Sequence, residues 1–144
     1  MATKHDDMQA LYDQNLAAVK SSVAAFENND LAAFFSNVSD SVKWHSPAYG
    51  DTIMTKAHWM ELLKGLEGNW SKWHLSNALF LPGIDSTSHA MDGSVRFYGR
   101  WDGEHKASGM ATKLEFYGAY EFNKDHKVKE AFEYADVGGL MNAV

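Results

Sequence analysis

The sequence predicts one α+β domain in which three helices cover one face of an antiparallel sheet. Apolar residues recur at helical spacing in the first part of the chain, whereas turn signals divide the rest into stretches rich in aromatic and β-branched residues. The 144 residues include 45% apolar types and no internal repeat, linker or charge block, as in a single domain. We expect one unit over 1–144, with a core over about 6–136 and a loose C-terminal tail over 137–144.

Three helices are expected before residue 70. From 6 to 27, apolar residues recur at steps of three and four and form one stripe of a long helix. Asp30 is suited to cap a short helix over 31–35, because its carboxylate accepts backbone N–H groups that a first helical turn leaves free. A third helix is expected over 55–66, where four apolar side chains share a face. The first stripe consists of Met8, Tyr12, Leu16, Val19, Val23 and Phe26, and the third of Trp59, Leu62, Leu63 and Leu66.

Five strands are expected, the first between the second and third helices and the other four after residue 70. Their ranges are 41–46, 71–81, 88–101, 110–122 and 127–136. Turn signals at Pro82-Gly83, at Asp102-Gly103 and in the polar run 123–127 separate the later strands. Asp92-Gly93 falls inside the third strand, where it indicates a bulge or a turn.

Alternation along two neighbouring strands separates an inner from an outer face. The inner sets are Val95, Phe97, Gly99 and Trp101 on one strand and Leu114, Phe116, Gly118 and Tyr120 on the next. On the outer face, Arg96 or Arg100 is placed to pair with Glu115 or Glu121 across the strands. The aromatic residues of that face are Tyr98, Tyr117, Phe132 and Tyr134. A face this aromatic indicates that two copies pack sheet to sheet as a homodimer.

Charge and composition argue against several classes of protein. The 13 Lys and Arg residues against 19 Asp and Glu residues give a net charge of −6, the wrong sign for a nucleic-acid partner. There is no apolar run near the ~20 residues of a membrane span, and the start MATKHDDMQ lacks the apolar core of a signal peptide. We therefore expect a cytoplasmic protein with no membrane partner. Since the chain has no Cys, disulfide scaffolds, thiolate zinc sites and cysteine nucleophiles are excluded.

Two segments carry a resemblance to a known family, FENNDLAAFFSNVSDSVKWHSPAYGD at 26–51 and YEFNKDHKVKEAFEYAD at 120–136. With the order of helices and strands, they resemble the nuclear transport factor 2-like superfamily, and within it the SnoaL-like and ketosteroid-isomerase-like branch. The resemblance implies a cystatin-like α+β cone. In that cone a curved antiparallel sheet wraps around a long N-terminal helix and two shorter helices, enclosing an apolar cavity. It also implies dimers that form through the sheet.

The isomerase branch implies three catalytic side chains that this sequence lacks. Its Asp base before a Pro, its Tyr donor on the first helix and its protonated Asp donor on the penultimate strand align with Ser46, Ser22 and Gly118. Serine has no accessible basicity near pH 7, and glycine has no side chain. These three departures argue against steroid-type isomerisation.

Glu133 is the first candidate for acid–base chemistry. In the run from Ala131 to Ala135 it is opposite in phase to Phe132 and Tyr134, so it is expected to point inward. The SnoaL-like resemblance implies an acidic residue at this place, facing the cavity. A carboxylate in an apolar pocket has a raised pKa and can exchange a proton near neutral pH. The alternative is a structural carboxylate, hydrogen-bonded to Tyr120, Ser22 or a helix terminus.

His45 is the second candidate base, at the strand end where the family keeps its base. Alternation turns Trp44 and Ser46 inward and His45 toward the rim or outside, unless a bulge before Pro47 reverses the order. Its alternative is a surface histidine. The other histidines show no metal-ligand spacing, and no nucleophile elbow or phosphate loop is present, so we expect no metal site and no cofactor.

A set of mostly aromatic side chains is expected to bind the ligand, with plain core packing as the alternative. The set is Phe26, Trp44, Ser46, Trp59, Phe97, Trp101, Phe116 and Tyr120. Gly99 and Gly118 remove two side chains from the inner face, which either permits curvature or leaves volume for a ligand. The rim is assigned to Tyr12, Tyr49 and Met54, with the loop 48–54 as a lid.

These residues indicate a small-molecule-binding protein with an apolar cavity. If it is an enzyme, the resemblance implies cofactor-free proton transfer of the cyclase, isomerase or dehydratase type on a hydrophobic metabolite. Glu133 would then carry the proton, with Tyr120 and Ser46 as polar guides. The alternative is a non-catalytic ligand-binding or dimeric interaction module of the same fold.

Overall fold

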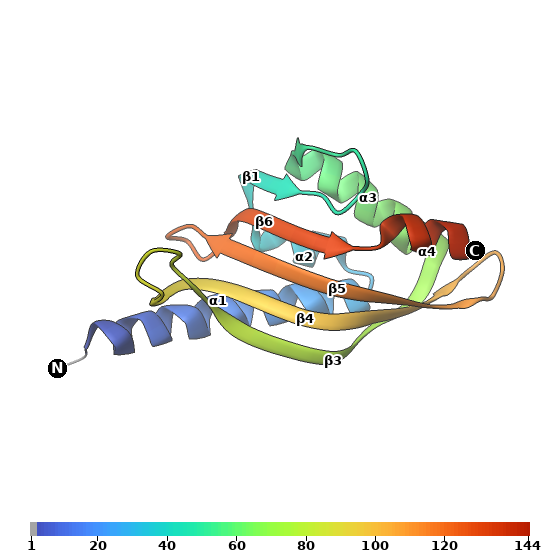
Figure 1. Cartoon of the computed structure of the whole chain (residues 1–144). Helices are drawn as coiled ribbons and strands as arrows, with labels where there is room; N and C mark the ends of the chain where they lie inside the picture. Colours follow the sequence, from blue (N-terminus) through green and yellow to red (C-terminus); the bar gives the residue numbers. More distant parts are fainter. Residues whose placement is uncertain (1–2) are drawn as a thin grey trace.

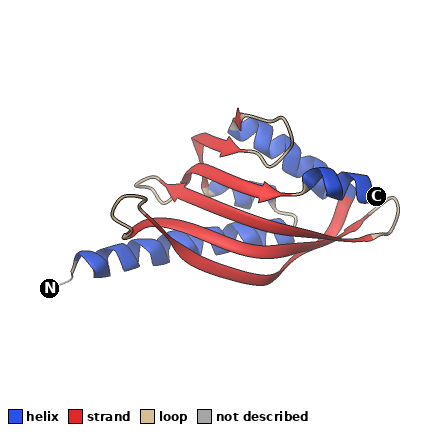
Figure 2. Cartoon of the chain, in the orientation of Figure 1, coloured by secondary structure: helices blue, strands red, loops and turns tan. Residues whose placement is uncertain are grey.

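A computed structural model describes residues 3–144 and contains one sheet with helices against it (Figures 1 and 2). The predicted α+β class and the three predicted helices are confirmed. In chain order the elements are α1 (Lys4–Glu27), α2 (Leu31–Ser36), β1 (Val38–His45), β2 (Ile53–Met54), α3 (Lys56–Asn69), β3 (Trp70–Ile84), β4 (Met91–His105), β5 (Ala111–Phe122), β6 (Val128–Ala135) and α4 (Val137–Ala143).

The sheet has six strands in the order β2-β1-β6-β5-β4-β3. Its neighbouring strands are antiparallel except for β1 and β6, which run parallel. The expectation of an antiparallel sheet therefore needs this one correction. Its cause is topological, since α3 and four strands separate β1 from β6 along the chain, and a connection of that length allows a parallel return.

Helix α1 runs lengthwise along the sheet and contacts β3 and β4, as Figure 1 shows. It begins at a capping box, in which Thr3 Oγ1 accepts from the Asp6 N–H and Asp6 Oδ2 accepts from the Thr3 N–H. Its buried stripe includes a polar residue, Asn15, which is 2% exposed. Asn15 Nδ2 donates to the Gly93 carbonyl at 2.9 Å, and its Oδ1 lies 3.0 Å from His126 Nδ1. This amide ties α1 to β4 and to the turn before β6.

The C-terminal segment is helical, so the expectation of a loose tail over 137–144 was wrong. Gly138 and Gly139 have low helix propensity, which explains the expectation. The helix α4 nevertheless forms, because Asp136 Oδ1 accepts from the Gly139 N–H at 2.8 Å and Leu140 is 5% exposed against the core. The two-residue strand β2 within the expected lid loop was also not predicted.

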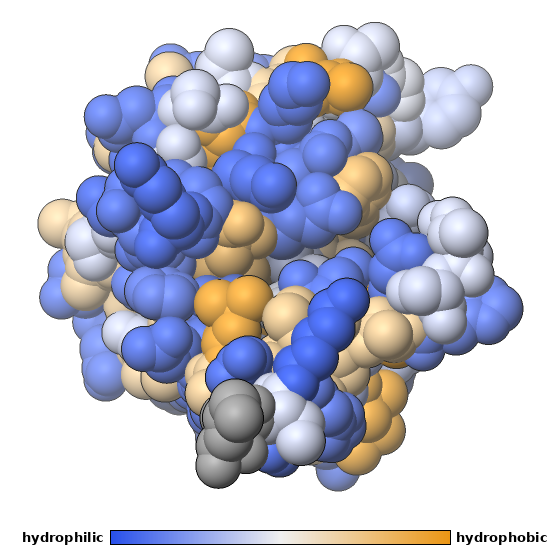
Figure 3. Space-filling view, turned by 90° about the vertical axis from the view of Figure 1, so that its left-hand side faces the viewer, coloured by the Kyte–Doolittle hydropathy of each residue, from blue (hydrophilic) through white to orange (hydrophobic). Residues whose placement is uncertain are grey.

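The predicted inner face is confirmed. Val95, Phe97, Trp101 and Tyr120 are all buried, with Val95 fully inaccessible. The end of the molecule at which α1 begins is covered mostly by hydrophilic residues, with smaller apolar groups between them (Figure 3). Within 3–144, no helix combines the length and the hydropathy that a membrane span requires.

On the outer face, Tyr98, Tyr117 and Tyr134 form a ladder across three strands. Their ring centroids are 4.7 Å apart for the first pair and 5.7 Å for the second, and Tyr98 and Tyr134 are exposed. The aromatic outer face that the alternation predicts is therefore present.

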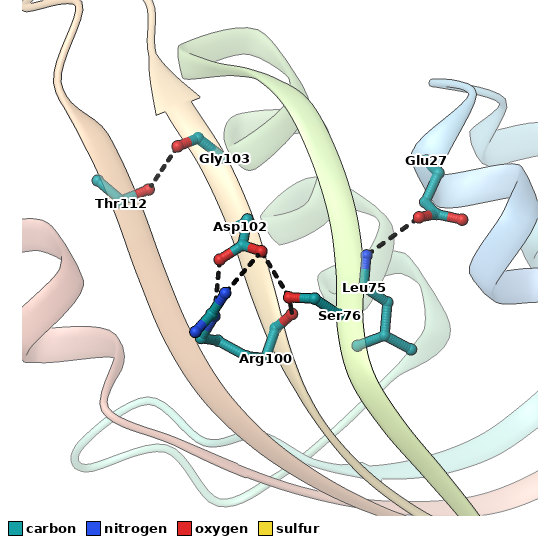
Figure 4. Close-up of polar contacts among 7 residues, drawn as sticks. All are labelled: Glu27, Leu75, Ser76, Arg100, Asp102, Gly103 and Thr112. Atoms are coloured by element: carbon teal, nitrogen blue, oxygen red, sulfur yellow. Dashed lines mark hydrogen bonds and ion pairs between the residues drawn. The ribbon is translucent and has the colours of Figure 1, made fainter.

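Arg100 lies opposite Glu115 in the register of β4 and β5, as expected, but its hydrogen bonds go elsewhere. Its Nε donates to Asp102 Oδ1 at 2.8 Å, and Ser76 Oγ donates to Asp102 Oδ2 at 2.5 Å (Figure 4). Asp102 takes the guanidinium because it stands two residues along the same strand, on the same face. The predicted position of Arg100 across from Glu115 is thus correct, but its hydrogen-bond partner is Asp102.

Candidate functional site

An apolar cavity of about 120 Å³ lies between the helices and the inner face of the sheet. Helices α1, α2 and α3 contribute to its wall, and α4 adds Val137, Leu140 and Met141. The α4 residues were missed by the sequence analysis. The available signal was Asp136 as a helix cap before a segment that carries Leu140.

Most of the side chains expected to bind the ligand line this cavity. They are Phe26, Trp44, Trp59, Phe97, Trp101, Phe116 and Tyr120. Ser46 does not line it, because β1 ends at His45 and strand alternation stops there. Ser46 Oγ instead donates to Asp51 Oδ2 at 2.7 Å and accepts from the Ala48 N–H at 3.2 Å, which stabilises the loop after β1. Pro47 reaches the wall in its place.

Glu133 lines the cavity from β6, on the face that the alternation predicts. Its Oε1 accepts a hydrogen bond from Trp44 Nε1, and its Oε2 accepts one from the Tyr120 hydroxyl, each at 2.7 Å. The Trp44 indole is itself held by stacking on Trp59, with centroids 5.2 Å apart. Among the wall residues that the structure describes, Glu133 is the one carboxylate.

Burial has the largest effect on the pKa of the Glu133 carboxyl. Removal from water raises the pKa of the Glu133 carboxyl above its usual range, and this effect outweighs the two hydrogen bonds, which lower it. The Glu133 side chain is half-buried, and it lines the apolar cavity. Burial, followed by the charge and hydrogen bond of Glu133, raises the pKa of Tyr120 well above its usual range, so Tyr120 remains a neutral donor.

The alternative for Glu133 is a structural carboxylate that is hydrogen-bonded to Tyr120, Ser22 or a helix terminus. The structure contains one of these bonds. The bond to Tyr120 is present, whereas Ser22 bonds to Asn37 instead. Each carboxylate oxygen accepts one of these bonds and retains a second lone pair. The contacts therefore fix the orientation of Glu133 and leave it able to meet a ligand.

Gly118 and Gly99 do not leave open volume. A Cβ at Gly118 would stand 2.5 Å from the Tyr120 hydroxyl oxygen, and a Cβ at Gly99 would stand 2.7 Å from Leu75 Cδ1. Neighbouring side chains fill both spaces, so of the two alternatives, curvature or ligand volume, the structure argues against ligand volume. The function of Gly118, which lies opposite Glu133 in the register, is to let the Tyr120 ring reach the carboxylate.

His45 lies on the outer face, away from the cavity. Its Nε2 is 2.8 Å from Glu130 Oε2, and its ring stacks on Phe132 with centroids 4.0 Å apart. Because Trp44 points inward and no bulge reverses the order at the end of β1, His45 is not placed to act as a base in the cavity. Tyr12, Tyr49 and Met54, which were assigned to the rim, are not among the residues that line the cavity. In the described range, no group of three or more His, Asp or Glu residues could hold a metal ion.

Replacing Gly118 by Ala is expected to move Tyr120 and break its bond to Glu133. The added methyl group would occupy the place of the phenol, so we expect a loss of about 1 to 3 kcal/mol in the free energy of unfolding. Urea unfolding measures the loss. Gly65→Ala is the control, because a Cβ at Gly65 meets no atom within 4 Å; equal stability of the G118A variant and wild type would contradict the assignment.

The raised pKa of Glu133 predicts a pH dependence of stability. Below pH 4.5, the ordinary pKa of the carboxyl, the group is protonated in both the folded and the unfolded state, and its contribution to stability is fully present. As the pH rises through the raised pKa, the unfolded chain has already released the proton and the folded chain must ionise a buried group, so that contribution is lost. We expect the stability of wild type relative to Glu133→Gln to fall over this range, as measured by urea unfolding from pH 4 to 8. A constant difference, equal to that of the exposed Glu61→Gln control, would refute the prediction.

Neither a protein-family model nor a curated protein matches the sequence. Solved structures do match. A protein from Silicibacter sp. TM1040, provisionally named a polyketide cyclase, is similar over 90% of this chain and 94% of its own, with 14% identity and a TM-score of 0.72. The pinacolase BvnE from Penicillium brevicompactum is similar over 92% of this chain and 93% of its own, with 15% identity and a TM-score of 0.70.

An NTF2-like protein from Burkholderia xenovorans is similar over 91% of this chain and 95% of its own, with 19% identity and a TM-score of 0.67. Near-complete coverage of both chains means that the likeness extends over the sheet and the helices together. The sequence resemblance is thereby confirmed at the level of the fold. The chain has the nuclear transport factor 2-like fold.

Proposed function

We propose that the cavity binds a small hydrophobic or aromatic molecule and that Glu133 exchanges a proton with it. The reaction is of the cofactor-free cyclase, isomerase or dehydratase type. One observation carries the proposal: a carboxylate with a raised pKa, oriented by Trp44 and Tyr120, on the wall of an otherwise apolar cavity.

Proton transfer suits this arrangement for two reasons. A carboxylate whose pKa is raised toward neutral pH is a better base when ionised, and it also populates the acid form that returns the proton. Tyr120 and Trp44 hold both carboxylate oxygens without supplying charge, so the group keeps one position through both steps. The apolar wall limits competing water.

The names of two structural neighbours support the reaction type. One is provisionally named a polyketide cyclase and another is a pinacolase. Because they share only the fold at this level of identity, the names support a class of chemistry and no particular substrate.

The second candidate function is ligand binding without catalysis. It is favoured by the two hydrogen bonds to Glu133, since a carboxylate satisfied by protein donors can have a purely structural function. In that case the cavity and its ligand remain, and the proton transfer is absent.

Deuterium incorporation separates these functions. A panel of small hydrophobic metabolites is first screened by quenching of tryptophan fluorescence, and the compounds that bind are incubated with the protein in D₂O. We expect incorporation into a carbon-bound position, detected by mass spectrometry, with wild type but not with Glu133→Gln. Glu130→Gln, on the same strand but the opposite face, is the control. Ligands that bind wild type without incorporation would favour the binding function.

We also propose that two copies associate through the outer face of the sheet. Tyr98, Tyr117 and Tyr134 supply an exposed aromatic surface there. We expect Tyr134→Asp to shift the protein from dimer to monomer in light scattering, because it places a charge in that surface. Tyr49→Asp is the control, since Tyr49 is fully exposed in the loop after β1. A monomeric wild type, or a dimeric Tyr134→Asp variant, would contradict the proposal.

A further inference from the structure

The indole N–H of Trp73 is a buried donor on the cavity wall that no protein group uses. Trp73 is on β3, lines the cavity and is 5% exposed. Within residues 3–144, no protein atom accepts a hydrogen bond from its Nε1. A buried donor without an acceptor costs free energy, and native structures contain few of them. This N–H is therefore a candidate for a contact that the protein alone does not supply.

The side chains around Trp73 hold its ring in place but offer it no acceptor oxygen. The ring centroid lies 5.7 Å from that of Phe26, 6.1 Å from that of Trp70 and 6.5 Å from that of Trp101. A Cβ at Gly103 would stand 2.7 Å from Trp73 Cε3, so the indole occupies the space that this glycine leaves. Because aromatic rings and backbone surround it, the indole has little freedom to turn its N–H toward solvent.

Glu67 is the other described residue with a buried side-chain atom that lacks a partner, its Oε1. It is on α3 and does not line the cavity. An indole N–H and a carboxylate oxygen are complementary, but the structure contains no hydrogen bond between Trp73 and Glu67. Pairing of these two residues is the internal alternative to a ligand, and an experiment has to separate the two.

The chemistry of the donor defines the ligand atom that it contacts. An indole N–H donates and never accepts, so the matching atom is an acceptor such as a carbonyl oxygen. No Lys or Arg lines the cavity in the described part of the chain, so an anionic acceptor would enter an apolar space without a counter-charge. A neutral carbonyl group avoids that penalty.

Trp73 and Glu133 stand at different places along the cavity. Glu133 lies opposite Gly118, which in turn lies opposite Phe97 on β4. The Trp73 ring meets Gly103, which is further along the same strand. A carbonyl group at Trp73 is therefore remote from the carboxylate, and the proton transfer would occur at another atom of the ligand.

We infer that Trp73 anchors the ligand through its indole N–H, which donates a hydrogen bond to an uncharged carbonyl oxygen. The wall adjusts to admit that oxygen, as side chains commonly do on binding. Because the contact is made away from Glu133, it determines which molecules bind and not how the proton moves. The inference rests on the proposed function, in that it names the class of molecule that the cavity binds, a neutral carbonyl compound.

Acetophenone and cumene test the inference, because a carbonyl oxygen in the first is replaced by a methyl group in the second. One ring with a short substituent suits a cavity of about 120 Å³, since an engineered apolar cavity of about 150 Å³ holds benzene. In ¹⁵N-labelled protein we expect acetophenone, but not cumene, to move the Trp73 indole proton resonance downfield, as a hydrogen bond does. NMR titration is expected to show about fivefold tighter binding of acetophenone, the effect of one hydrogen bond of ordinary strength.

Two variants assign this preference. Trp73→Phe keeps an aromatic ring and removes the N–H, so the ratio of the two dissociation constants is expected to fall to about one. Trp70→Phe is the matched control and is expected to keep the ratio, because Trp70 does not line the cavity and its Nε1 already donates to Thr112 Oγ1 at 3.1 Å. If Trp73→Phe does not fold, the wild-type resonance decides, since its assignment by through-bond NMR needs no variant.

The outcomes separate this inference from the proposed function. Absence of the downfield shift in wild type, or an unchanged ratio in Trp73→Phe, would overturn the inference and leave the cavity as a binding site. A Trp73 resonance that responds to Glu67→Gln and not to acetophenone would overturn it in favour of the internal pair. Binding of neither compound, nor of any compound in the metabolite panel, would overturn both. Loss of deuterium incorporation in Glu133→Gln, with the Trp73 shift retained, would support both.

Discussion

A carboxylate placed inside an apolar cavity is the constraint on which the rest of this site depends. Burial of an ion costs several kcal/mol unless protein groups replace the lost water. Here Trp44 on β1 and Tyr120 on β5 donate to the two oxygens of Glu133 on β6. The same two bonds connect three neighbouring strands, so the position of the carboxylate and the local shape of the sheet are set together.

The surrounding residues are explained by what those bonds require. The Tyr120 ring reaches Glu133 only because Gly118 has no side chain, and the Trp44 indole keeps its direction because it stacks on Trp59. Desolvation still raises the pKa of the carboxyl, so the donors reduce the penalty without removing it. Because its charge is only partly compensated, a carboxylate of this kind can still change its protonation state.

Alternation along the strands gives the two faces of the sheet different properties. On β6, Glu133 faces the cavity while Phe132 and Tyr134 face outward, and on β1, Trp44 faces inward while His45 pairs with Glu130 outside. A shift of one residue in the pairing register of a strand would turn its inward side chains outward and its outward side chains inward. The parallel pairing of β1 with β6 sets the register that brings Trp44 to Glu133, although 89 positions separate them in the chain.

The sequence by itself determined the α+β class, the three main helices, the inner and outer faces of the strands and the inward direction of Glu133, because the repeats of helix and strand are local properties of the backbone. Only the tertiary structure decided the donors that hold Glu133, the exclusion of Ser46 and His45 from the cavity, the helix α4 and the contact between Ser22 and Asn37. Those features depend on contacts between segments that lie far apart in the chain, and on where a strand ends, which periodicity does not specify.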